Sequence, residues 1–276
     1  VIKSLNSTYD IHEANDRIQK LIQKKKDLII SHGFPADYLE PHFSCPDCKD
    51  TGYIDREPCH CLKQKIIGIT FNQFSLTEHI GACDFKNFSL DYYSATVIDP
   101  GSQKSELELA KNAFRTSKKF VSDMLNGDTP NSILFYGNAG TGKTFLSNCI
   151  AKELLTNGHS VIYFSATKLF DTLRESRFAR DNAKSDYNKI FNSDVLIIDD
   201  LGTENLTDFN LSQFFYCLNE RLLKNKPMII STNLNVIELK EHYSERISSR
   251  IYSNFNLLKF CGDDIRLRQK INSTKI

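Results

Sequence analysis

The chain has 276 residues, which is enough for one large domain or two modest ones. Its 35 Lys and Arg residues nearly balance its 34 Asp and Glu residues, so the net charge of +1 gives no global basic excess of the kind that marks many nucleic-acid-binding proteins. No apolar run approaches the length of a membrane span, and the first residues lack a signal-peptide core. We therefore expect a cytoplasmic protein that does not contact membranes.

The first predicted element is an amphipathic helix over residues 11–30. Its apolar residues recur at the spacing of one helical face, and Gly33 and Pro35 follow as stop signals. The basic run Lys24–Lys26 fits a solvated helix face and a helix that docks on a partner protein equally well.

Four of the eight cysteines form a compact cluster, Cys45, Cys48, Cys59 and Cys61. A Cys-x-x-Cys pair followed closely by a Cys-x-Cys pair suits four thiolates around one tetrahedral Zn²⁺. A redox-active pair is the alternative, although it does not explain the second pair, and His60 is a possible substitute for one thiolate. We predict a closed, structural zinc site. The other four cysteines are interpreted as small buried apolar residues rather than as a disulfide framework. These are Cys83, Cys149, Cys217 and Cys261.

The pattern between the cysteine cluster and the next strong motif is mixed. Residues 62–84 are partly helical, residues 94–106 are polar and predict a loop, and residues 107–125 return to helical spacing. Aromatic residues gather in Phe85–Tyr93. We interpret this segment either as packing or as a segment that flanks a nucleotide base.

Residues 137–144 have the pattern of a phosphate-binding loop, in which a Gly and four free positions precede Gly-Lys-Thr. The apolar run Ile133–Tyr136 predicts a buried strand before the loop, and helical spacing follows it. Backbone N–H groups of such a loop bind phosphate, Lys143 would reach the outer phosphates, and Thr144 would bind Mg²⁺. The predicted nucleotide-binding residues are Gly137, Asn138, Ala139, Gly140, Thr141, Gly142, Lys143 and Thr144.

Three further strands are predicted at residues 160–165, 194–200 and 227–233, with a long helical segment over 166–192. Acids at the end of an apolar strand suit Mg²⁺–phosphate chemistry, so we predict that Asp199 holds the metal and that Asp200 orients the attacking water. Asn233 would orient that water or contact the γ-phosphate. Alternating strands and helices indicate an α/β protein with a parallel sheet between helices and ligands at the C-terminal strand ends.

Five motifs, taken in order, resemble those of AAA+ ATPases of the DnaC/DnaI family of bacterial replicative helicase loaders. The phosphate loop is similar to Walker A. The other four are similar to Walker B, sensor 1, the box VII arginine motif and a sensor 2-like arginine; they are Asp199–Glu204, Ser231–Asn233, Glu245–Arg250 and Gly262–Arg266. The Cys45–Cys61 segment resembles the zinc-binding N-terminal part of the family. The resemblance covers about residues 40–270 and implies a helical and zinc-binding module at 1–80 and an AAA+ P-loop NTPase domain at 81–276.

The resemblance implies an ATPase that uses ATP, Mg²⁺ and Zn²⁺. It implies that Arg250, with Arg246 as the second candidate, reaches the ATP of a neighbouring subunit, and that Arg266 contributes to nucleotide binding. Asp200 stands where many AAA+ proteins have Glu. Ten residues follow Arg266, so we expect a reduced or absent helical lid.

The family also implies single-stranded DNA contact near the helices after the second strand. Basic and aromatic residues alternate there, which suits backbone neutralisation and base stacking. They are Lys168, Phe170, Arg174, Arg177, Phe178 and Arg180. Acidic residues dilute this charge, and a solvated face with two core phenylalanines explains the pattern equally well.

The implied partners are a replicative DnaB-type helicase, single-stranded DNA and further copies of the chain in an ATP-dependent oligomer. The predicted function is ATP-dependent loading of the replicative helicase during replication initiation or restart. The alternatives are an IstB-type transposition helper ATPase and a nucleotide-switched adaptor without significant hydrolysis. The zinc module favours the loader over the transposition helper.

Overall fold

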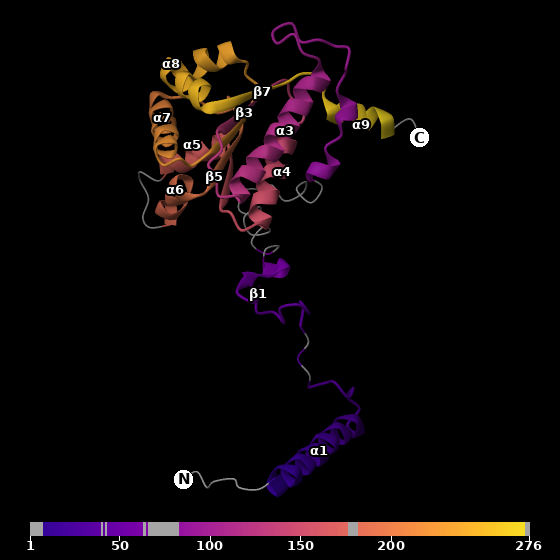
Figure 1. The fold of residues 1–276 in the computed structure, drawn as a ribbon. Helices are drawn as coiled ribbons and strands as arrows, with labels where there is room; N and C mark the ends of the chain where they lie inside the picture. The colour runs from indigo at the N-terminus through magenta and orange to yellow at the C-terminus, as the bar shows by residue number, and fades with distance from the viewer. Residues whose placement is uncertain are drawn as a thin grey trace. The chain divides into compact units, whose positions relative to one another are not determined.

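The computed structural model describes residues 8–39, 41, 43–62, 65, 83–175 and 182–273. Contacts divide the chain into two units, Val1–Gly52 and Tyr53–Ile276, which are described separately (Figure 1). A domain boundary after residue 80 stays a prediction, because residues 66–82 lie outside the described part of the chain.

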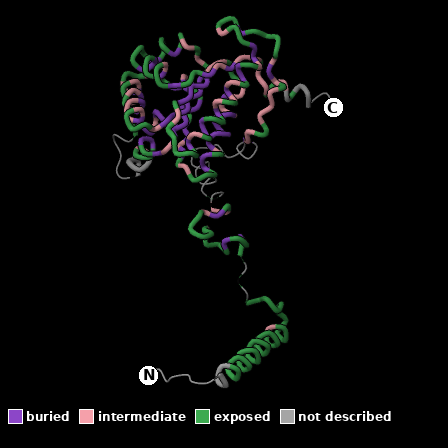
Figure 2. Tube along the Cα trace, viewed as in Figure 1, coloured by how far each residue is buried: buried purple, intermediate pink, exposed green. Residues whose placement is uncertain are grey.

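The N-terminal amphipathic pattern forms helix α1, Thr8–Ser31, as predicted. Figure 2 shows the helix exposed along nearly its whole described length. Its exposed apolar residues include Ile18, Leu21, Ile22 and Leu28. Among the described residues, no helix combines the length and the apolar character that a membrane span requires.

A five-stranded parallel sheet is the centre of the second unit. Its strands are β3 (Ser132–Gly137), β4 (Val161–Ser165), β5 (Val195–Leu201), β6 (Met228–Thr232) and β7 (Phe255–Phe260). They run in the order β4-β5-β6-β3-β7, and every neighbouring pair is parallel. A separate two-stranded hairpin pairs β1 (Tyr53–Ile54) with β2 (Glu57–Pro58).

Helices cover both faces of the large sheet, as the sequence predicted (Figure 1). One face carries α3 (Glu106–Leu125) and α4 (Lys143–Thr156). The other face carries α5 (Ala166–Glu175), α6 (Asn182–Asn192), α7 (Asp208–Leu223) and α8 (Val236–Asn254). Short 3₁₀ turns η2 (Phe85–Asn87) and η3 (Leu90–Tyr92) precede α3, and α9 (Ile265–Ser273) follows β7.

Side chains alternate between the two faces along each strand, so one sheet contributes to two hydrophobic cores. In β3, Ile133 and Phe135 belong to the core under α3 and α4, whereas Leu134 belongs to the core under α5–α8. Successive side chains of a strand point to opposite faces, so a strand buried on both faces is a nearly continuous apolar run. The apolar runs of β3, β5 and β6 fit their positions between neighbouring strands of the sheet.

The fifth strand, β7, was not predicted. It begins at Phe255, directly after α8 ends at Asn254, and no Gly or Pro separates the two elements. Its close pairing with β3 explains a glycine at the end of that strand. Gly137 has φ 126°, and a Cβ there would overlap the carbonyl group of Phe260.

Helix starts agree with local capping rules. Ser105 caps α3 in a reciprocal capping box with Glu108, and Asn235 caps α8 in the same way with Glu238. The predicted long helical segment 166–192 is two helices, α5 and α6, and residues 176–181 between them lie outside the described residues. The cap of α8 is next to the candidate site in the sequence, because Asn235 lies two residues after Asn233.

Candidate functional site

The three predicted polar strand ends meet at one edge of the sheet. Strands β5, β6 and β3 are neighbours, and Asp199, Asn233 and the phosphate-loop residue Gly137 come from their C-terminal ends. The carboxyl ends of parallel strands share an edge, where ligands bind in open α/β sheets. The topology therefore brings together residues that are far apart in the sequence.

Lys143 lies at the centre of this cluster with only 4% of its surface exposed. Its Nζ donates to the carbonyl oxygens of Gly137 at 2.7 Å and Asn138 at 2.6 Å, and to Oδ1 of Asn233 at 2.8 Å. These three bonds use all three donors of an ammonium group. A phosphate oxygen would therefore replace one of these acceptors.

Burial lowers the pKa of Lys143 to about 8. The negative charges of Asp200 and Asp199 raise this pKa, and the positive charge of Arg266 lowers it. A buried ammonium group gains from any further negative charge placed against it. Phosphate groups of a nucleotide would supply that charge.

The phosphate loop is held by Tyr93, a residue that the sequence had not assigned to the site. Its hydroxyl donates to the carbonyl oxygen of Thr141 at 2.8 Å. Gly142 has φ 101°, and a Cβ there would lie 2.7 Å from the same hydroxyl. Glycine is therefore required on both conformational and steric grounds. Aromatic density in residues 85–93 was the only sequence signal, and it does not identify which ring contacts the loop.

The other aromatic residues of this segment pack against α3 and α4. The ring of Phe88 lies 5.3 Å from that of Phe114 and 6.0 Å from that of Phe145, centroid to centroid. This favours the packing interpretation of the segment. A position beside the nucleotide base stays a prediction.

Asp199 is buried and accepts two hydroxyl hydrogen bonds on one carboxylate oxygen. Thr144 Oγ1 donates to Oδ1 of Asp199 at 3.1 Å, and Ser231 Oγ donates to the same oxygen. Neighbouring ligands of an octahedral Mg²⁺ with metal–oxygen distances of ~2.1 Å are about 3 Å apart. The Thr144 and Asp199 oxygens therefore fit a shared magnesium ion.

Asp200 differs from its neighbour, because the residue as a whole is exposed and its carboxyl group is only partly buried. Its φ of 54° is in the left-handed region, which is uncommon for a residue other than glycine. Burial of the carboxyl group and the charge of Asp199 raise its pKa, whereas Lys143 and Arg266 lower it. The Asp200 N–H donates to Ser231 Oγ at 2.9 Å, so one serine contacts both the side chain of Asp199 and the backbone of Asp200.

The segment that carries Arg266 lies against the phosphate loop. The N–H of Ile265 donates to the carbonyl oxygen of Gly140 at 3.0 Å, and Asp264 Oδ1 accepts from the N–H of Arg266 at 2.8 Å. The charge of Arg266 acts on both Lys143 and Asp200. The structure thus brings Arg266 to the cluster, and its role in nucleotide binding stays a prediction.

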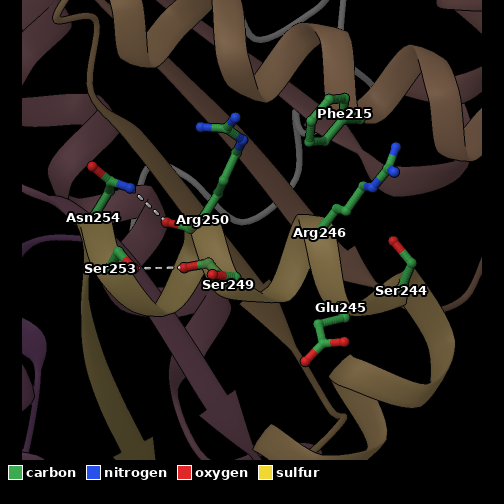
Figure 3. A pocket seen from close by; sticks show the side chains of 8 residues that line it. All are labelled: Phe215, Ser244, Glu245, Arg246, Ser249, Arg250, Ser253 and Asn254. Carbon is green, nitrogen blue, oxygen red and sulfur yellow. Dashed lines mark hydrogen bonds between the residues drawn. The ribbon is translucent and has the colours of Figure 1, made fainter.

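Arg246 and Arg250 lie in a different place. They line an open pocket on α7 and α8 that shares no lining residue with the nucleotide cluster. Figure 3 shows both side chains on the same face of α8, on either side of Phe215. The Arg250 guanidinium lies 5.2 Å from the centre of the Phe215 ring, which is within cation–π range. No sequence signal connected Phe215 with these arginines.

The predicted DNA-binding set is only partly described. Lys168 and Arg174 are exposed on α5, and Arg174 pairs with Asp171 at 2.6 Å. Phe170 is buried and packs 5.6 Å from the ring of Phe214, so of the two interpretations the core one holds for this residue. The remaining members of the set lie outside the described residues. They are Arg177, Phe178 and Arg180.

The cysteine cluster forms as the spacing predicted. Sulfur atoms of Cys45, Cys48, Cys59 and Cys61 lie within 4.8 Å of one another. Tetrahedral Zn²⁺ with Zn–S bonds of ~2.3 Å would place its sulfur atoms about 3.8 Å apart, so this spacing is close to that of a zinc site. The Gly52 N–H also donates to Cys48 Sγ at 3.3 Å, which suits a thiolate.

The scattered cysteines follow the apolar interpretation with one exception. Cys83, Cys149 and Cys217 are buried, and burial raises the pKa of the Cys149 thiol to about 12. Cys261 is only half-buried, because it lies just beyond the end of β7. None of these four described cysteines forms a disulfide.

Comparison with known proteins decides the family. The model of the family described as IstB-like ATP binding protein matches residues 114–273, which is more than half of the chain. The chain belongs to this family. The matched residues include the phosphate loop, the Asp199–Asp200 pair, Asn233, both arginines of α8 and Arg266.

Individual relatives agree with this assignment. The phage-like element PBSX protein XkdC of Bacillus subtilis (strain 168) is 30% identical, over 79% of this chain and 82% of its own length. The replicative helicase loader DnaC of Escherichia coli (strain K12) is 24% identical over 66% of this chain and 68% of its own length. A crystal structure of DnaI matches 67% of this chain and 91% of its own, with 26% identity and a TM-score of 0.51.

This IstB-like chain is accordingly an AAA+ P-loop ATPase related to DnaC and DnaI. The predicted family, fold class and ATPase activity are confirmed. The roles of individual residues in that activity stay predictions, and they lead to the first experiment.

Replacing Lys143 by Ala is expected to abolish tight ATP binding, because it removes the buried positive charge at the phosphate loop. Asp200→Asn is expected to keep ATP binding and lose most hydrolysis, because Asp199 and Thr144 still hold Mg²⁺. Nucleotide affinity and turnover, measured by titration with a fluorescent ATP analogue and by phosphate release, check both.

The exposed Lys111 of α3 provides a matched control, because Lys111→Ala removes the same charge away from the loop. It should bind and hydrolyse ATP like the parent. Parental turnover in Asp200→Asn would show that this carboxylate does not orient the attacking water.

Proposed function

We propose that this chain is an ATP-dependent loader of a replicative DnaB-type helicase that acts during replication initiation or restart. The observation that carries the proposal is the cluster of Lys143, Thr144, Asp199 and Asn233 in a domain similar to DnaC and DnaI. A four-cysteine segment and the exposed helix α1 precede that domain, and they supply features that ATP hydrolysis alone does not need.

The nucleotide site would work by positioning and charge. Lys143 and the backbone N–H groups of residues 137–144 would hold the phosphates of ATP. Thr144 and Asp199 would hold Mg²⁺, which neutralises charge on the phosphate oxygens. Asp200 and Asn233 would orient the attacking water; Lys143 links Asn233 to the loop at 2.8 Å, so the phosphate and water positions are set together.

The second part of the site would come from another copy of the chain. Arg246 and Arg250 are exposed, share a face of α8 and lie apart from the residues that would bind ATP in the same subunit (Figure 3). A guanidinium can approach phosphate oxygens in trans and stabilise charge as the γ-phosphate leaves. The competent ATPase would therefore be an ATP-dependent oligomer with Arg250 as the first candidate.

Two further surfaces would serve the macromolecular partners. Single-stranded DNA would contact α5, where Lys168 and Arg174 are exposed and where DNA phosphates would compete with Asp171 for Arg174. The exposed apolar residues of α1 favour the docking interpretation of that helix over a purely solvated one, with the helicase as the partner. Cys45, Cys48, Cys59 and Cys61 would hold a structural Zn²⁺ in a module at residues 1–80, followed by the ATPase domain at 81–276.

The runner-up function is a transposition helper ATPase, which the IstB-like family description favours. An adaptor without hydrolysis is disfavoured by the cluster of Lys143, Asp199 and Asp200. The partner protein, rather than the ATPase site, distinguishes the loader from the transposition helper.

The loader proposal predicts a specific complex with the replicative helicase encoded by the same genome. Immobilised chain should retain the purified helicase hexamer, and with ATP it should transfer the helicase to circular single-stranded DNA, measured by unwinding of an annealed strand. Lys143→Ala should retain the helicase but fail in the ATP-dependent transfer. Retention of a transposase but not of the helicase would establish the alternative.

The zinc proposal predicts about one Zn²⁺ per chain in protein purified without chelator, measured by atomic emission. Cys59→Ser should lose the metal and expose the N-terminal part to proteolysis, while ATP binding stays near the parental level. Cys217→Ser is the matched control, because Cys217 is buried in the core of the ATPase domain and should leave the zinc content unchanged. Protein with no bound zinc would contradict the site.

The trans-site proposal predicts that Arg250→Ala binds ATP almost normally but loses ATP-dependent assembly and stimulated hydrolysis, on the order of tenfold or more. A mixture of Arg250→Ala with Lys143→Ala should recover activity, because one intact site forms where the two variants meet. Size-exclusion chromatography and turnover measure both effects. Arg246→Ala is assayed in parallel: failure there alone would assign the role to Arg246, and parental behaviour of both would exclude the site.

A further inference from the structure

The loop after β5 contacts α8 through Glu204. This carboxylate is buried, with 8% of the residue exposed. One of its oxygens accepts from the N–H of Gly202 at 3.0 Å, and the other accepts from the hydroxyl of Tyr243. Glu204 lies four residues after Asp200, so the loop that directly follows the Asp200 end of β5 has a buried connection to the helix that carries Arg246 and Arg250.

Tyr243 is the last residue before a break in α8. It is fully buried, and its ring packs 5.7 Å from that of Phe214. The next residue, Ser244, has φ 74° and ψ 158°, which are not helical. The helix resumes after it and carries Arg246 and Arg250. Tyr243 therefore anchors the point from which the arginine-bearing half of α8 starts.

The break is held by polar contacts on both sides. Ser248 Oγ donates to the carbonyl oxygen of Ser244 at 2.8 Å, and the hydroxyl of Tyr252 donates to the carbonyl oxygen of Val236 in the first turn of α8. That first turn is capped by Asn235, two residues after Asn233. Both strand ends that carry Asp200 and Asn233 thus lead directly into contacts that hold the arginine segment.

The Glu204–Tyr243 contact is costly to break. Burial and the negative charge of Glu204 raise the pKa of Tyr243, so the hydroxyl stays protonated and acts as the donor. The surrounding core is apolar, with Phe214, Leu239 and Ile247 in the same cluster. A buried carboxylate that loses one of its donors is left partly unsatisfied, which penalises any arrangement that separates the loop from α8.

We infer that Glu204 and Tyr243 are positioning residues that hold the arginine-bearing half of α8 in register with the end of β5, where Asp200 lies. Each subunit would then present Arg250 to its neighbour in a pose set by its own ATPase loop. This inference rests on the proposed trans site. It adds the residues that aim the arginine, neither of which touches nucleotide.

The test uses the mixed assembly, in which the two roles are separated. Arg250→Ala protein donates the nucleotide site, and Lys143→Ala protein donates the arginine. Tyr243→Phe is added to one partner at a time. In the arginine donor it should lower the recovered turnover on the order of tenfold, whereas in the site donor it should change turnover by less than about twofold. ATP affinity of the site donor should stay at its original value.

Tyr216→Phe is the matched control, because this exposed tyrosine of α7 is not part of the contact. It should leave the recovered turnover unchanged whether it is placed in the arginine donor or in the site donor. A loss of similar size in both arrangements, with a lowered melting temperature, would show that Tyr243 only stabilises the fold and would overturn the inference. Equal turnover in both arrangements, without loss, would also overturn it.

If the Tyr243→Phe protein does not fold, the Glu204→Gln variant tests the same inference. Glu204→Gln retains an oxygen for the Tyr243 hydroxyl but removes the charge, so the same asymmetry is expected with a smaller loss in the arginine donor. Absence of recovery in the unmodified mixture would instead reject the trans site itself, and this inference with it. If neither variant changes the recovered turnover, the inference alone is rejected and the trans site is retained.

Discussion

The ATPase site depends on one buried carboxylate, that of Asp199, at the point where three parallel strands end. Two hydroxyl groups, from Thr144 on the phosphate-loop helix and Ser231 on β6, donate to the same oxygen of this acid. A buried charge is tolerated only when its hydrogen bonds are complete, so this acid fixes the spacing of the loop, β5 and β6. Lys143 adds a second connection across the same edge through Asn233.

The rest of the domain extends this arrangement away from the nucleotide. On one face, Tyr93 holds the phosphate loop by its Thr141 carbonyl group, and the aromatic segment before α3 packs behind it. On the other face, the loop after Asp200 reaches α8 through Glu204. One ATPase site is therefore built against both cores of the sheet, and the proposed arginine in trans is attached to the second core. This arrangement is consistent with the proposed assembly of several copies.

Local rules accounted for much of the molecule. The phosphate loop, the strands at both acids and Asn233, helix α1 and the proximity of the four cysteines all follow from short sequence patterns, because each depends on neighbours within about one element. Features that depend on contacts between distant residues were harder to predict from the sequence. The strand β7 follows a helix without a break signal, and Phe170 sits in a basic segment although its side chain packs on Phe214 in the core.

The sequence by itself determined that this chain is a P-loop ATPase with acids at the end of an apolar strand and four thiols close together. Those conclusions rest on residue type and spacing, which dictate chemistry locally. Only the tertiary structure decided that Tyr93 holds the loop, that Ser231 contacts both Asp199 and the backbone of Asp200, that Phe215 lies between two arginines and that Glu204 contacts Tyr243. Each of these joins residues distant in the chain, and their meeting depends on strand order and on how each helix packs over the sheet.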